Sequence, residues 1–86
     1  MSACNFSIDF SKSVTEILNK AKTTVESQGG NFTGDESAGN FDVSIFGNTV
    51  VGSYVINGQS LNIDISDKPF LVPCSMIENF LKSQLN

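Results

Sequence analysis

Three consecutive apolar runs, each bounded by turn residues, constrain the fold of this chain more than any other feature. They span residues 41–46, 49–56 and 60–66. The first and third alternate apolar and polar residues, which is typical of a strand with one buried face, and the second is rich in β-branched and aromatic residues. Asn57-Gly58 joins the last two runs and favours a tight hairpin, because both central residues of such a turn take positive φ. We therefore expect three consecutive antiparallel strands.

Two further strands and two helices are expected around these runs. Residues 6–10 also alternate and predict a first strand, while residues 31–33 predict a short second one. Ser13 opens a capping-box sequence, and apolar residues then recur at spacings of three and four, so we expect a helix over residues 13–28. Pro73 suits the first turn of a second amphipathic helix close to the C-terminus. The polar stretch over residues 34–40 is expected to be a mobile hairpin loop.

These elements predict an α+β fold with the order β-α-β-β-β-β-α. A chain of 86 residues is long enough for one modest core and too short for two, so residues 1–86 should form a single domain. We expect a curled antiparallel sheet whose last strand pairs with the first, with both helices packed on one face. The strand side chains expected beneath the helices are Phe6, Ile8, Phe10, Phe41, Val43, Ile45, Val50, Tyr54, Ile56, Leu61, Ile63 and Ile65.

The charged residues argue against several classes of function. Nine acidic residues and five lysines give a net charge of −4, and the chain has neither Arg nor His. Proteins that bind nucleic acid neutralise phosphates with cationic side chains, so we do not expect a nucleic-acid partner. The lack of His removes the commonest general base and metal ligand. We therefore expect no catalytic residue, no metal site and no cofactor.

The two cysteines, Cys4 and Cys74, lie near opposite ends of the chain and form no CxxC pair. Secreted domains that depend on disulfides usually carry more, so we expect free thiols in a reducing compartment. The N-terminal residues lack a basic region followed by a long apolar run, and no run is long enough to span a bilayer. A cytoplasmic protein without a membrane span is expected. Cys74, at a helix start, is either a reactive thiol or a packing residue.

The sheet face away from the helices is the candidate contact surface. Phe46, Val51 and Val55 are expected to form an apolar strip there, with Ser53 between the two valines. Such a strip can mark a dimer or partner contact. It also occurs on ordinary solvated faces, because isolated exposed apolar residues need no partner. Both interpretations stay open.

The same face carries two acidic residues that suggest a catalytic alternative. If Asp9 and Asp64 were neighbours on adjacent strands, the close carboxylates could split their pKa values for acid–base work. No nucleophile, oxyanion donor or metal ligand accompanies them in the sequence. Alternating Ser and Asp on a solvated strand is the commoner meaning, so we do not expect an enzyme.

The second half of the chain resembles the polyhydroxyalkanoic-acid-system proteins, a family of granule-regulatory proteins. The matching residues are Ile45-x-Gly47, Val50-x-Gly52-x-Tyr54-x-Ile56, Leu61-x-Ile63-x-Ile65, Pro73, Ile77-Glu78, Phe80 and Leu81. This resemblance implies a non-enzymatic accessory protein whose surface meets a storage granule, another protein or itself. The order of elements is also similar to a shortened helix-grip fold, which implies an apolar-ligand carrier.

Two hypotheses of function follow. The first is an accessory or binding module that forms a homodimer or docks a protein partner through the outer sheet face, at Phe46, Val51, Ser53 and Val55. The second is a small carrier that holds an apolar ligand between the sheet and the helices. The seven Phe residues either line such a cavity or fill the core.

Overall fold

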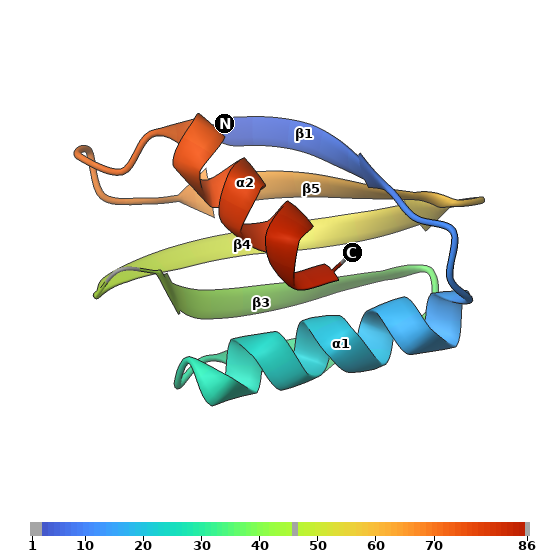
Figure 1. Cartoon of the computed structure of the whole chain (residues 1–86). Helices are drawn as coiled ribbons and strands as arrows, with labels where there is room; N and C mark the ends of the chain where they lie inside the picture. Colours follow the sequence, from blue (N-terminus) through green and yellow to red (C-terminus); the bar gives the residue numbers. More distant parts are fainter. Residues whose placement is uncertain (1–2, 46, 86) are drawn as a thin grey trace.

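Five strands join in one open antiparallel sheet, in the order β1-β5-β4-β3-β2. A computed structural model describes residues 3–45 and 47–85 of the chain. Figure 1 shows both helices on the same side of the sheet, as expected. The last strand pairs with the first, so the predicted α+β fold and its topology are confirmed. The elements are β1 (Cys4–Asp9), α1 (Val14–Ser27), β2 (Asn31–Gly34), β3 (Ala38–Ile45), β4 (Asn48–Asn57), β5 (Ser60–Asp67) and α2 (Cys74–Leu85).

Local sequence signals set the limits of α1. The hydroxyl of Ser13 accepts a hydrogen bond from the backbone N–H of Glu16 at 3.2 Å, which satisfies one of the free donors of the first turn. The helix ends at Ser27, and Gly29 beyond it has a φ of 79°, a conformation that glycine adopts without strain. Within the described residues, neither helix is long and apolar enough to cross a membrane.

The helices and the inner sheet face share one hydrophobic core. All the strand residues predicted for it are buried except Phe6 and Ile56, which are half-buried and pack against it. Phe6 lies on β1, at the edge of the sheet, and Ile56 lies next to the β4–β5 turn, so fewer neighbours cover them. The helices contribute Ile17, Val25, Ile77, Leu81 and Leu85.

The β2–β3 connection is shorter than expected, because β3 already begins at Ala38. The predicted loop over residues 34–40 is therefore wrong for most of its length. The carboxylate of Asp35 accepts hydrogen bonds from the backbone N–H groups of Ser37 and Ala38, and these hold the pKa of Asp35 below its ordinary value. Tyr54 donates its hydroxyl to the carbonyl oxygen of Asp35 at 2.7 Å, and burial raises the pKa of Tyr54. These bonds stabilise a tight turn.

Cys4 and Cys74 form a disulfide, so the prediction of free thiols is wrong, and Cys74 is not a reactive thiol. The bond joins the first residue of β1 to the first residue of α2, with Cα atoms 5.7 Å apart and a sequence separation of 70. The sheet explains the pairing, because Cys4 lies opposite Ile65 near the end of β5, from which the chain leads into α2. The spacing of two cysteines in a sequence cannot show this proximity.

Candidate functional site

The outer face of β4 carries the candidate contact residues. Val51 and Val55 are 37% and 47% exposed, with half-buried Ser53 between them. All three lie on the face opposite the helices, because the alternate residues Val50, Gly52 and Tyr54 are buried. Phe46, the fourth predicted residue, lies outside the residues that the structure describes.

The neighbouring strands surround Val51 with carboxylates. Val51 lies opposite Asp42 on β3 and Asp67 on β5. Ser53, in the next row, lies opposite Asp64 of β5. A β-bulge between Val51 and Gly52 shifts the pairing with β5, and it brings Asp67 beside Val51. An apolar side chain thus stands among three acidic ones.

Several polar side chains on this face bond to one another. Ser7 donates its hydroxyl to the side-chain oxygen of Asn62 at 2.5 Å, and Ser60 donates to Asp9 at 2.6 Å. Asp64 differs: its Oδ1 is shielded from solvent and accepts no hydrogen bond from the described residues. A shielded carboxylate oxygen without a donor is energetically costly.

Asp9 and Asp64, the pair that the catalytic alternative requires, are not neighbours. Asp9 lies opposite Ser60, whereas Asp64 lies opposite Asn5, four residues away along β1. The two carboxylates therefore do not form the close pair that would split their pKa values. In the described ranges, no three His, Cys, Asp or Glu side chains gather closely enough to hold a metal ion.

A second apolar feature was not identified from the sequence. Phe70 and Leu71, in the connection from β5 to α2, are 93% and 85% exposed. Val72, which follows them, is buried, and its N–H donates to the carbonyl oxygen of Pro69. This hydrogen bond closes a turn in which the side chains of Phe70 and Leu71 face the solvent. In the sequence, the signal for this feature is a run of three apolar residues between Pro69 and Pro73, outside the expected strands and helices.

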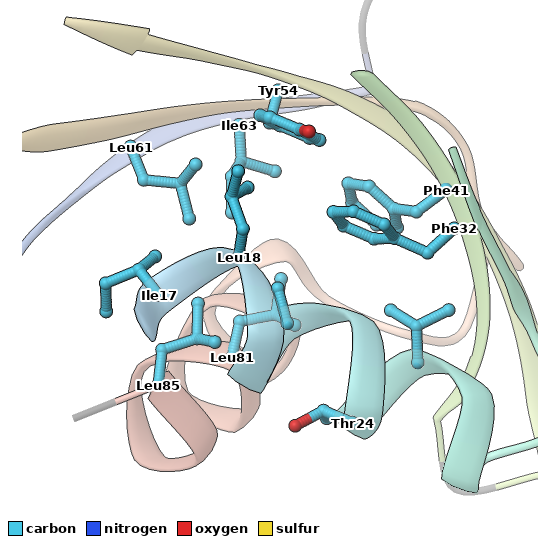
Figure 2. Close-up of a pocket in the computed structure, with 12 residues that line it drawn as sticks. Ile17, Leu18, Thr24, Phe32, Phe41, Tyr54, Leu61, Ile63, Leu81 and Leu85 are labelled. Atoms are coloured by element: carbon cyan, nitrogen blue, oxygen red, sulfur yellow. The ribbon is translucent and has the colours of Figure 1, made fainter. Parts of the chain in front are cut away.

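The space between the helices and the sheet contains a small apolar cavity. Figure 2 shows side chains from both helices and from the sheet around it. Its volume is about 30 Å³, roughly the share of one water molecule in the liquid. The rings of Phe32 and Tyr54 stack beside it with centroids 5.4 Å apart. The aromatic residues here mainly fill the core.

Comparisons with known proteins found no matching family model, no matching curated protein and no matching solved structure. We therefore infer function from the surfaces of this chain.

Proposed function

We propose that this chain is a non-enzymatic binding module that docks a protein partner through the outer face of its sheet. The observation that carries the proposal is the exposure of Val51 and Val55 on β4, the central strand of the five. Full burial of a Val side chain contributes about 1.5–3 kcal/mol, so a partner that covers both gains a useful part of that free energy. The polar residues around them resemble the rim of a protein interface.

Position-specific cross-linking in cells that make the protein tests this proposal. A photoreactive benzoylphenylalanine replaces Val55 in one variant and Lys22, exposed on α1, in a control. We expect a discrete cross-linked product from position 55 that is absent from position 22 and weakened by Val51→Asp. No product from position 55, or the same products from both positions, would refute docking at this face. A product of twice the chain mass would identify the partner as a second copy.

The carrier of an apolar ligand is the weaker candidate. Ligand pockets for small molecules usually measure about 300–1,000 Å³, whereas the cavity between the sheet and the helices measures about 30 Å³. Native mass spectrometry of the protein as purified from cells tests for a retained apolar compound, and finding one would revive this hypothesis.

Granule association and a cytoplasmic location stay predictions. The first depends on the family resemblance alone. The second has to be weighed against the disulfide between Cys4 and Cys74, because disulfides persist mainly in oxidising compartments. Fractionation of cells that make the protein tests both, with the granule fraction and the cytosol compared by quantitative immunoblot.

A further inference from the structure

We infer that the outer sheet face takes a cationic protein segment, one that presents Lys or Arg side chains, and not a second copy of this chain. The inference rests on the proposed docking function and names the chemistry of the partner.

The charged residues that lie near Val51 on this face are all acidic. Asp42 and Asp67 lie on either side of Val51, and Asp64 lies on β5 beside Ser53. Two strand spacings separate β3 from β5, so the backbones at Asp42 and Asp67 lie about 10 Å apart across the face. A fourth acidic residue, Asp9, lies toward the other end of the same face.

No cationic side chain of the strands balances these carboxylates. The five lysines of the chain are all outside the strands: Lys12, Lys20, Lys22, Lys68 and Lys82. The salt bridge found among the described residues joins Lys82 to Glu78, within α2. Lys68 directly follows Asp67 in sequence, and no salt bridge joins the two in this part of the chain. Among the described residues, no lysine therefore neutralises the carboxylates of this face.

The mixture of groups matches a Lys or Arg side chain better than a simple cation. Such a side chain has an apolar stem that can cover Val51 and a charged end that can reach Asp42 or Asp67. It also brings N–H donors, which can form charge-assisted hydrogen bonds with the exposed carboxylate of Asp67.

A second copy fits the same face poorly. Two copies packed face to face would bring their Asp42, Asp64 and Asp67 side chains together without a lysine between them. Like charges brought together at an interface oppose association. A segment of opposite charge is attracted to the face even before contact.

Fluorescence anisotropy with two labelled peptides tests the inference. In one peptide Lys alternates with Val, and in the other Glu replaces every Lys. We expect saturable binding of the Lys peptide at about 50 mM salt, marked weakening at about 300 mM, and no binding of the Glu peptide.

Asp42→Asn with Asp67→Asn should weaken binding about fivefold or more, the combined effect of two exposed ion pairs. The Asn side chain at position 42 retains the oxygen that accepts from the N–H of Asn31.

The matched control is Glu16→Gln with Glu26→Gln, which removes the same charge from two exposed positions on α1, on the other side of the sheet. We expect nearly unchanged binding from it. Val51→Thr with Val55→Thr, which keeps the β-branched shape, should weaken binding as well. Equal weakening by both charge-removing pairs, or no binding of the Lys peptide, would overturn the inference. Position-specific cross-linking at position 55 would then still report whether another kind of partner docks there, so the two proposals can fail separately.

Discussion

Reduction of the Cys4–Cys74 disulfide should greatly lower the free energy of unfolding. The bond closes a loop with a sequence separation of 70 residues. For a loop of that length, the chain-entropy relation gives a denatured-state entropy loss of about 15 cal/mol/K, or about 4 kcal/mol at 25 °C. Residual structure in the denatured chain makes this an upper estimate. Domains of this length have a total stability of roughly 4–13 kcal/mol, so the bond supplies a large share.

Urea unfolding with and without a thiol reductant measures this contribution. The reduced protein should unfold at lower urea concentration, and its m-value should rise because the denatured chain without the cross-link exposes more surface. Cys4→Ala with Cys74→Ala is the control, since a reductant should not change its unfolding curve. The double substitution also removes packing at Cys4, which is 5% exposed, so its absolute stability differs from that of the wild type. The comparison is therefore between each protein with and without the reductant.

Two results would refute this reasoning. A difference of less than about 1 kcal/mol between oxidised and reduced protein would show that the bond does not constrain the denatured chain as the loop length requires. Rapid alkylation of both cysteines in native protein prepared without reductant would show that the disulfide is not formed.

Three further predictions concern particular side chains. Gly52→Ala should destabilise the fold by about 1–3 kcal/mol in urea unfolding, because an added Cβ would lie 2.9 Å from the ring of Phe41; an unchanged midpoint would contradict this packing. Phe70→Ser with Leu71→Ser should change the unfolding free energy by less than about 0.5 kcal/mol per site, since both side chains are exposed; a larger loss would show that they pack in solution. Asp35, with its pKa lowered by backbone hydrogen bonds, stabilises the fold fully above about pH 3.9 and progressively less below it. Asp35→Asn should therefore show a shallower fall of unfolding free energy below that pH, and equal slopes would contradict the role of its charge.

The sequence determined the elements and their buried faces. The alternation of Phe41, Val43 and Ile45 with polar residues correctly predicted which side chains of β3 are buried. Successive side chains of a strand point to opposite faces, so all three apolar side chains can be buried only on the same face. Ser13 fixed the start of α1 through a hydrogen bond to its own first turn. Such signals act between near neighbours in the chain, so they can be identified from the sequence alone.

Only the tertiary structure decided which distant residues meet. Strand register separated Asp9 from Asp64 and placed Asp42 and Asp67 on either side of Val51. The pairing of β1 with β5 brought Cys4 within bonding distance of Cys74, and the turn before α2 directed its apolar residues to the solvent. Register depends on hydrogen bonds between strands that are far apart in sequence, and a bulge of one residue changes it. The candidate docking surface is therefore a property of the assembled sheet.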